Sequence, residues 1–236
     1  DISNLIVTID LGSSNIVGLA GIKEGNKIKV VATEKVTSEG AIRRGSIVNI
    51  DVCASKIRNL ITKLEDKLST NIQGVFVGIG GQSVRTVKNN ISRHLPEGTK
   101  ITSTLLDELN KEGRYLPISA SEIVDAIPNE TYINDLIVEN PLGKEAKKIQ
   151  LNMQLVVARQ TIAKKISEVF EKVGVPIIDL ILSSKADAEA ILTKEDKLKG
   201  CVLVNFGGGI TEVSIYTNGY LRQISTLPLG GKNITM

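Results

Sequence analysis

The sequence of 236 residues predicts an α/β protein built on a duplicated hairpin unit, with a smaller α+β unit inserted between the two copies. Three observations lead to this expectation. Residues 5–14 and 202–211 share one pattern, in which an apolar strand runs into Asp10 or Asn205 and then into a turn of small residues. Amphipathic segments alternate with apolar runs after the first copy, as in folds that pack helices on a sheet. This alternation stops between about residues 81 and 158 and then resumes.

Each copy continues as a three-stranded meander. After the first turn, two further apolar strands are expected at residues 16–22 and 27–33, joined by a polar turn. Residues 212–226 repeat this arrangement around Asn218-Gly219, and Asn-Gly between alternating apolar strands is a strong hairpin signal. Because internal similarity describes a whole architecture, we expect two related halves in one fold.

The small residues of the two turns indicate phosphate binding. Gly and Ser let the backbone approach an anion closely and present N–H groups to it, so two such turns can hold one phosphate chain between them. Asp10, at the end of its strand, can hold a metal beside those phosphates, directly or through water. The candidate phosphate-binding residues are Asp10, Gly12, Ser13, Ser14 and Asn15 in the first copy, and Asn205, Gly207, Gly208, Gly209, Ile210 and Thr211 in the second.

Plainer interpretations of these residues stay open. Any β-hairpin needs glycines in its turn, although the succession Gly207 to Gly209 is costly because each glycine loses much backbone entropy on folding. Ser13 and Ser14 could simply cap their hairpin, and Asp10 could be a hydrogen-bonding residue at the end of a strand.

Composition and charge are those of an ordinary soluble globular protein. The net charge of +3 is spread over interspersed acidic and basic residues, so Arg43-Arg44 and Lys147-Lys148 are interpreted as solvated loop charges, and no nucleic-acid partner is expected. The absence of Trp also argues against base stacking. No run of about 18 apolar residues predicts a membrane span, and the start at Asp1, without Met or a signal peptide, suggests a trimmed end.

The cysteines and the histidine suggest no chemistry of their own. Cys53 and Cys201 are far apart and lack metal-ligand spacing, so both are expected to be reduced, buried side chains of a cytoplasmic protein. His94 stands in a polar stretch without the partners that a catalytic triad or a zinc site would need.

Between the copies, the first segment is expected to complete a compact unit. Residues 52–68 place apolar side chains on one face at helical spacing, and Asp51 can cap this helix. Residues 74–79 follow as a buried strand.

The insertion has a different pattern of predicted elements. Strands are expected near residues 83–91 and 149–157, and a short helix near residues 104–113. Residues 127–132 are punctuated by a proline, and residues 140–143 form a turn. These features indicate a separate α+β unit.

After the insertion, a second amphipathic helix is expected at residues 160–173, ending at Gly174, which is a favourable residue just past a helix end. A strand at residues 175–182 and a short Ala-rich helix at residues 184–192 follow. The Lys-rich residues 193–200 are expected to be a polar loop at a domain boundary.

Together these features resemble the actin, Hsp70 and sugar-kinase superfamily, and within it most closely the FtsA family of bacterial cell-division proteins. The resemblance covers nearly the whole chain in order. It is carried by the first turn at residues 10–14, the small-residue loop at 40–49, the segments at 127–132 and 140–143, and the second turn at 206–209 with residues 216–219. The segments at 127–132 and 140–143 separate the FtsA family from other actin-like proteins.

The resemblance implies an α/β, actin-like (ribonuclease H-like) duplicated fold with an inserted α+β subdomain 1C and an incomplete second half. The implied boundaries are residues 1–80 for the first part of subdomain 1A, 81–159 for subdomain 1C, 160–199 for the rest of subdomain 1A, and 200–236 for the start of subdomain 2A.

It also implies that ATP and Mg²⁺ bind between the two halves, with Asp10 facing the metal, and that residues 81–159 mediate self-association into protofilaments. The family links the tubulin-like FtsZ ring to the cytoplasmic face of the inner membrane at the division site, among other division proteins. FtsZ-tail binding and most adenosine contacts are expected from a second half, and membrane attachment from a carboxy-terminal amphipathic helix. These residues would then be a fragment or a truncated product.

Departures from the family's motifs argue against rapid ATP hydrolysis. Asn205 stands where the second phosphate motif usually has Asp, and Ile210 replaces a hydroxyl expected to face phosphate. Asn15 occupies a position often taken by Lys, and residues 183–185 lack the Glu-Pro of some superfamily ATPases. Phosphoryl transfer depends on how metal and nucleophile are positioned, so we expect a slow ATPase at most, with Asp10 and Asn205 as the candidates for a catalytic role.

Two alternatives within the superfamily stay open. A small-molecule kinase would need a carboxylate base directed toward a substrate hydroxyl, which neither Asn205 nor residues 183–187 supply convincingly. A pilus-assembly adaptor of the same fold would bind a partner's peptide in place of FtsZ.

Overall fold

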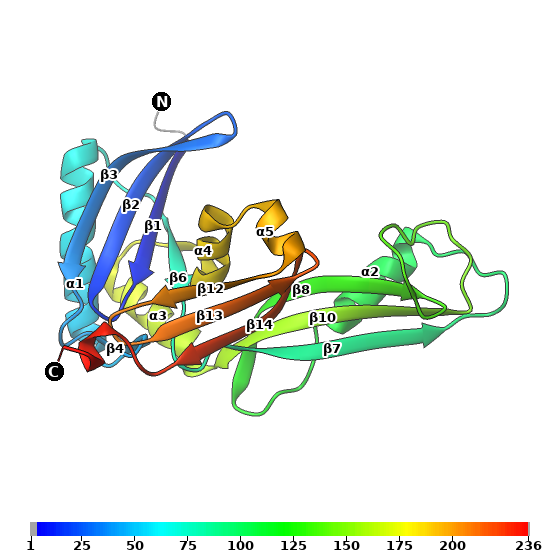
Figure 1. Ribbon diagram of the computed structural model, residues 1–236. Helices are drawn as coiled ribbons and strands as arrows, with labels where there is room; N and C mark the ends of the chain where they lie inside the picture. The colour runs from blue at the N-terminus through cyan, green and yellow to red at the C-terminus, as the bar shows by residue number, and fades with distance from the viewer. Residues whose placement is uncertain (1–3, 236) are drawn as a thin grey trace.

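The computed structural model describes residues 4–235, and it has the duplicated α/β architecture expected from the sequence. A first domain lies at one end, and a long inserted sheet extends away from it (Figure 1). The second meander lies along this inserted sheet and contacts it (Figure 1).

The first copy of the repeat forms the antiparallel meander β1 (Leu5–Leu11), β2 (Asn15–Glu24) and β3 (Lys27–Thr37), as expected. Strands β6 (Val75–Ile79) and β11 (Ile177–Leu182) join β1 in parallel, giving the order β11-β6-β1-β2-β3. Since β1, β6 and β11 are parallel, their carboxyl ends meet at one edge of the sheet. The first small-residue turn therefore lies beside the segments that follow β6 and β11.

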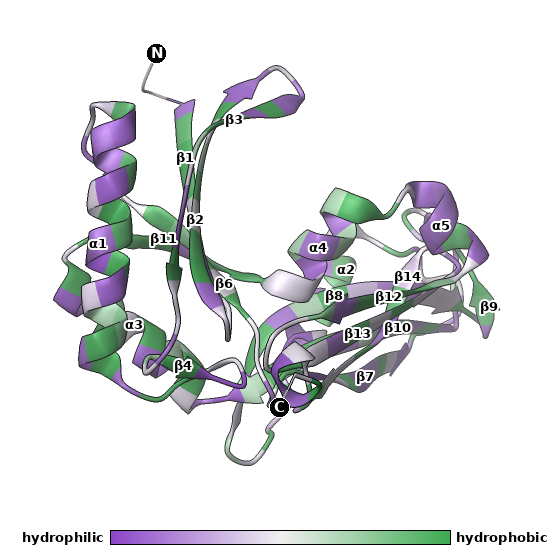
Figure 2. Cartoon of the chain, turned by 60° about the vertical axis from the view of Figure 1, so that its left-hand side comes forward, coloured by the Kyte–Doolittle hydropathy of each residue, from purple (hydrophilic) through white to green (hydrophobic). Residues whose placement is uncertain are grey.

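Helices α1 (Ile50–Leu68) and α3 (Thr161–Val173) cover one face of this sheet and pack against each other. Both hydrophilic and hydrophobic residues occur along α1 (Figure 2), and the buried ones recur at the three- to four-residue spacing of an amphipathic helix. Ser69 is the cap residue that follows α1, and Gly174 is the one that follows α3, where its positive φ of 84° suits glycine. Side chains of this core that are almost wholly buried are Ile9, Ile16, Ile57, Leu60 and Leu64.

The cap of α1 differs from the sequence prediction. The Oδ1 atom of Asn49, not of Asp51, accepts a hydrogen bond from the backbone N–H of Val52 at 3.0 Å. Asp51 lies in the first turn of the helix, and its carboxylate is 2.9 Å from Nζ of Lys172 on α3. The helix begins earlier than expected because Asn49 has the extended backbone of a capping residue. A small hairpin of β4 (Ile42–Arg43) and β5 (Ser46–Ile47) precedes it.

The insertion is an α+β unit with the strand order β7-β10-β8-β9. Its strands are β7 (Arg85–His94), β8 (Ser121–Ile133), β9 (Leu136–Ile137) and β10 (Lys148–Arg159), so the strands expected near residues 83–91 and 149–157 are confirmed. Residues 127–132, which contain Pro128, lie within β8. The proline is tolerated because the pairing of β8 with β10 is irregular there, between Leu151 and Met153.

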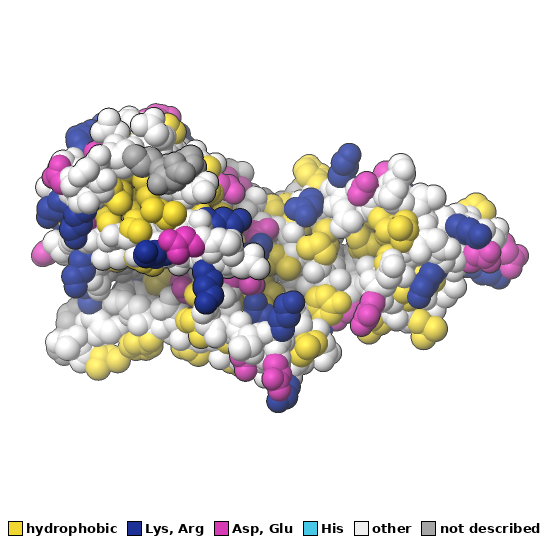
Figure 3. All heavy atoms as spheres, turned by 90° about the horizontal axis from the view of Figure 1, so that it is seen from above, with side chains coloured by type: hydrophobic (Ala, Val, Ile, Leu, Met, Phe, Trp, Pro, Cys, Tyr) yellow, Lys and Arg dark blue, Asp and Glu magenta, His cyan; other side chains and the backbone are white. Residues whose placement is uncertain are grey.

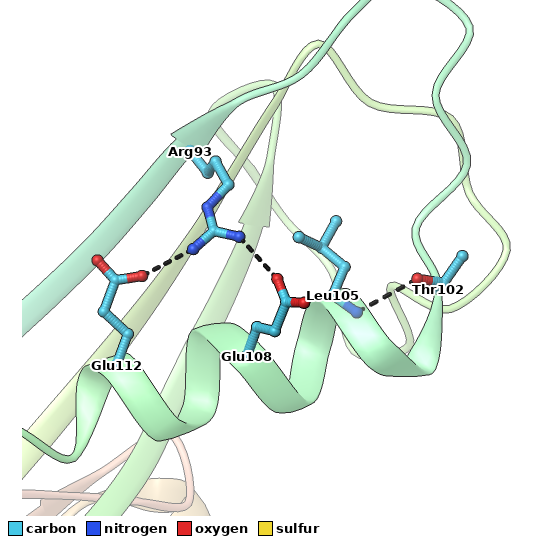
Figure 4. A network of polar contacts seen from close by, with 5 residues as sticks. All are labelled: Arg93, Thr102, Leu105, Glu108 and Glu112. Atoms are coloured by element: carbon cyan, nitrogen blue, oxygen red, sulfur yellow. Dashed lines mark hydrogen bonds and ion pairs between the residues drawn. The ribbon is translucent and has the colours of Figure 1, made fainter.

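Helix α2 (Ser103–Gly113) covers the inserted sheet where a helix was expected. The guanidinium of Arg93 on β7 contacts the carboxylates of Glu108 at 3.0 Å and Glu112 at 2.8 Å (Figure 4). Thr102 caps the helix by accepting a hydrogen bond from the N–H of Leu105 (Figure 4). The cap stabilises the start of the helix, and the two ion pairs attach its second half to β7.

The second copy forms β12 (Cys201–Phe206), β13 (Thr211–Thr217) and β14 (Tyr220–Leu227), the expected antiparallel meander. Helix α4 (Ser183–Ile191) joins it to the first domain, and a short 3-10 helix, η2 (Gly231–Asn233), follows it.

The expectation of a loop at residues 193–200 is wrong. Helix α5 (Lys194–Lys199) forms there, because Thr193 and Asp196 make a reciprocal capping box. The salt bridge between Lys199 and Glu195, four residues apart, adds to it.

Both cysteines are free thiols; Cys53 is buried as expected, whereas Cys201 is only half-buried. On the face seen in Figure 3, basic and acidic side chains are interspersed. Among the helices of residues 4–235, none combines the length and the apolar character needed to cross a membrane.

Candidate functional site

The two small-residue turns border one cavity of about 450 Å³. The candidate residues that line it are Asp10, Gly12, Ser13, Ser14, Asn15, Asn205, Gly207, Gly208 and Ile210. Gly209 and Thr211, the other two candidates, do not line the cavity. Thr211 is buried, and its hydroxyl donates a hydrogen bond to the carbonyl oxygen of Leu229.

The two hairpins place equivalent residues at equivalent positions. Asp10 pairs with Val17 across the first hairpin, and Asn205 pairs with Glu212 across the second, in both cases seven residues further along the chain. Directly opposed residues of an antiparallel pair carry their side chains on the same face. The second hairpin therefore brings Glu212 beside Asn205, where the first hairpin has an apolar residue.

The turns are also in direct contact. A Cβ atom added to Gly209 would lie 2.8 Å from Cβ of Ser13, so only glycine fits this close approach. The hydroxyl of Ser13 accepts a hydrogen bond from the N–H of Gly45 at 2.8 Å. The backbone carbonyl oxygen of Ser13 accepts another from Nζ of Lys232 at 3.0 Å. These bonds attach Ser13 to the loop between β4 and β5 and to η2, which follows the second meander.

Acidic side chains converge at one side of the cavity. Nδ2 of Asn205 donates a hydrogen bond to Oδ2 of Asp187 at 2.7 Å, and Asp187 comes from α4. Asp10 and Glu212 also line this region. Glu212 is 7% exposed, and its Oε1 atom has no hydrogen-bond partner among the residues that the structure describes.

This crowding of carboxylates changes their acidity. Burial raises the pKa of Glu212 to about 7, and the negative charges of Asp187 and Asp10 add to the effect. Asp10 opens into the cavity, yet desolvation by the surrounding protein raises its pKa as well, and Asp187 raises it further. A cation at this position would relieve both effects.

The protein groups do not form a metal site by themselves. Between residues 4 and 235, no three His, Cys, Asp or Glu side chains are grouped so that they could hold a metal ion. A Mg²⁺ ion would therefore need phosphate oxygens and water to complete its coordination, which is how this ion is usually bound. The orphaned Oε1 of Glu212 and the open side chain of Asp10 fit such an arrangement.

The sequence did not single out Asp187, Glu212 or Lys232 as site residues. Glu212 could have been found from its seven-residue spacing to Asn205, which matches that of the first hairpin. Asp187 and Lys232 reach the site through the packing of α4 and η2, and no local pattern signals that approach.

Arg159, Thr161 and Lys165, around the start of α3, also line this cavity. Nζ of Lys165 donates a hydrogen bond to the carbonyl oxygen of Ile47 at 2.8 Å. The lining therefore includes acidic side chains from the hairpins and α4 and basic side chains from residues around the start of α3.

Paired meanders around a shared cavity, with an α+β unit inserted between them, define an actin-like ATPase fold. A solved structure of a PilM-PilN type IV pilus biogenesis complex is similar, with a TM-score of 0.67 and 17% identity over 98% of this chain and 63% of that one. No protein-family model matches the sequence.

Among curated proteins, the chain is homologous to proteins named cell division protein FtsA. That of Porphyromonas gingivalis is 28% identical over 99% of this chain and 50% of its own length, and that of Neisseria meningitidis is 27% identical over 98% and 56%. The chain therefore spans about half the length of the curated relatives that it matches.

Proposed function

We propose that the chain is part of an actin-like cell-division protein that binds ATP with Mg²⁺ between its two hairpins and acts by assembly, with slow hydrolysis at most. The observation that carries this proposal is the convergence of both turns on one cavity, with acidic side chains at one side. The homology to FtsA proteins supports the role in division.

In this proposal the backbone N–H groups of the two turns bind the phosphates, and Ser14 adds a hydroxyl. Asp10 and Glu212 face the metal, and Asn205 holds Asp187 in place by the 2.7 Å hydrogen bond. When bound, Mg²⁺ would neutralise phosphate charge. Asn205 carries no charge and Ile210 no hydroxyl, so nucleotide serves mainly as a ligand that fixes the closed arrangement of the hairpins.

Assembly belongs to the same proposal. The inserted unit, within the predicted boundaries 81–159, would mediate self-association into protofilaments. A link from FtsZ to the inner membrane at the division site, with other division proteins as further partners, would need residues beyond those present here.

The alternative of a pilus-type adaptor has one supporting observation, the likeness to the PilM-PilN complex. That likeness, at 17% identity, concerns the fold alone, whereas the FtsA relatives match at 27–28%. The kinase alternative gains an acid in Glu212, but this carboxyl is buried beside Asp10 and Asp187, where it is better suited to a metal than to a substrate hydroxyl.

Nucleotide binding can be tested by titrating the ¹⁵N-labelled protein with ATP, with and without Mg²⁺, and following backbone amide resonances. We expect weak binding, in about the millimolar range, with Mg²⁺-dependent shifts at Gly12, Gly207 and Gly208. Asp10→Asn should remove the Mg²⁺ dependence. Asp66→Asn makes the same chemical change on the exposed side of α1 and should leave it intact. The absence of shifts at the turn glycines in the parent protein would overturn the proposal.

The second prediction concerns Asn205. Asn205→Asp replaces a donor to Asp187 with a carboxylate, so without metal the variant should have a lower Tm than the parent. Mg²⁺ and ATP should then raise its Tm more than they raise that of the parent, and Mg²⁺-dependent ATP hydrolysis should increase. Equal responses of the two proteins to Mg²⁺, measured by differential scanning calorimetry, would show that Asn205 lies outside the metal geometry.

A further inference from the structure

Residues 127–132, in the middle of β8, have no role in the cavity. They lie where the pairing of β8 with β10 is irregular, since Thr131 pairs with Leu151 and Pro128 with Met153. Asn129 and Glu130 both lie opposite Asn152, which makes a β-bulge. Bulges of this kind redirect side chains and are often found at functional positions.

The redirected side chains reach the second meander. The carboxylate of Glu130 pairs with the guanidinium of Arg222 on β14, and Nδ2 of Asn129 donates a hydrogen bond to the carbonyl oxygen of Leu221 at 3.3 Å. Glu130 is 8% exposed, whereas the side chain of Arg222 is 27% exposed, so this ion pair is partly shielded from water and salt. Arg222 is held further by Thr217, to whose hydroxyl its Nε donates at 2.9 Å.

A second group of contacts holds the other end of β14. The N–H of Ile224 donates a hydrogen bond to the hydroxyl of Thr86 at 3.2 Å, and the hydroxyl of Thr226 donates to the carbonyl oxygen of Val84 at 3.4 Å. Val84, Leu221 and Ile224 are buried in one hydrophobic core. The inserted unit therefore contacts β14 along its length. Figure 1 shows the inserted sheet and the sheet of the second meander lying side by side.

The attachment of the insertion to the first domain is of another kind. It includes two chain connections, one after β6 through Gly80 and Gly81, and one at Gln160, where β10 passes into α3. An ion pair from Nζ of Lys185 on α4 to Oδ2 of Asp125 on β8, at 2.8 Å, adds a side-chain contact. Gly81 has a φ of 118°, which few other residues adopt, and Gln160 makes no side-chain cap. The insertion therefore has one partly exposed ion pair beside these connections, whereas several hydrogen bonds and an ion pair attach it to β14.

We propose that residues Thr86, Asn129, Glu130, Leu221, Arg222 and Ile224, here named the clasp, join the inserted unit and the second meander into one mechanical unit. A change in the separation of the two phosphate turns would then move the far end of the insertion relative to the first domain. Only the trigger of this motion, nucleotide between the turns, rests on the proposed function; the joint itself does not.

The joint can be tested by double electron–electron resonance on the full chain, with Cys201→Ser to remove the accessible native thiol. Spin labels at Glu97→Cys and Gln223→Cys report the insertion against the second meander, and labels at Glu97→Cys and Asp66→Cys report it against α1. We expect a narrow distance distribution for the first pair. Arg222→Glu should broaden it about twofold, and the double reversal Glu130→Arg with Arg222→Glu should restore it.

The matched control is Arg93→Glu, because Arg93 pairs with Glu108 and Glu112 inside the inserted unit and not with β14. It should leave the first distribution narrow. Should Arg222→Glu fail to fold, as judged by circular dichroism, Arg222→Met and Thr86→Val test the two ends of the clasp separately. Unchanged widths in folded clasp variants, or a double reversal as broad as the single one, would overturn the proposal.

Measurements with and without nucleotide distinguish a failure of this proposal from a failure of the proposed function, on which its trigger rests. If ATP with Mg²⁺ binds, the Glu97–Asp66 distance should shift in the parent protein, and Arg222→Glu should lose the shift. If the amide titration shows no binding, the proposed function fails, and the nucleotide-free widths still decide whether the clasp exists.

Discussion

Replacing Glu212 with Gln is expected to stabilise the folded protein by about 3 kcal/mol at pH 8 and by less than about 0.5 kcal/mol at pH 4. The physical reason is burial of this carboxyl beside Asp187 and Asp10, which raises its pKa from 4.5 to about 7. Between these values the folded protein holds a proton that the unfolded chain has released, so stability falls as pH rises through this range. Gln imitates the protonated acid at every pH and avoids the loss.

The measurement is urea unfolding followed by far-UV circular dichroism at pH 4, 6 and 8, since the chain has no Trp to report by fluorescence. Glu39→Gln is the matched control, because it removes an exposed carboxylate of the first domain outside the cavity. Its effect should be small at all three pH values. An effect of Glu212→Gln that does not grow with pH would contradict the assigned environment of Glu212.

Gly230→Ala is expected to destabilise the protein by roughly 2 kcal/mol and to abolish Mg²⁺-dependent nucleotide binding. A Cβ atom at position 230 would lie 2.7 Å from backbone atoms of both Gly208 and Gly209, closer than real Cβ atoms come. The backbone of η2 or of the second turn would have to move, which would break the hydrogen bonds from the N–H groups of Gly231 and Lys232 to the turn carbonyls.

The neighbouring glycine supplies the control. A Cβ atom on Gly231 would meet only the carbonyl oxygen of Gly207 at 3.9 Å, which is an ordinary contact. Gly231→Ala should therefore change stability by less than about 0.5 kcal/mol. Chemical denaturation of both variants, together with the amide titration, compares the two substitutions at adjacent positions. Equal behaviour of the two variants would show that the approach of residue 230 to the turn is not tight in solution.

The fold could be predicted from the sequence largely because its signals are local. Asn218-Gly219 and the small-residue turns specify the meanders, and the spacing of Ile57, Leu60 and Leu64 specifies the buried face of α1. The Lys-rich composition of residues 194–199 predicts a loop and not helix α5, although Thr193 and Asp196 have the spacing of a capping box. The cap of α1 is not decided by residue type, since Asn49 and Asp51 are both good capping residues.

The candidate site was predictable only in part. The turn residues could be identified because they follow strands in a repeated pattern. The acids that complete the site depend on tertiary packing, which brings Asp187 from α4 to the amide of Asn205. The boundaries of the inserted unit and the roles of the site residues stay predictions.

The equal seven-residue pairing in the two hairpins separates the charge of the site from its backbone. The first hairpin has Asp10 and Val17 at the two paired positions, and the second hairpin has Asn205 and Glu212 at the equivalent ones. Substitution at one copy alters charge while leaving the shape of both copies intact. The charge at the cavity can therefore differ between the two hairpins while the backbone pairing stays the same.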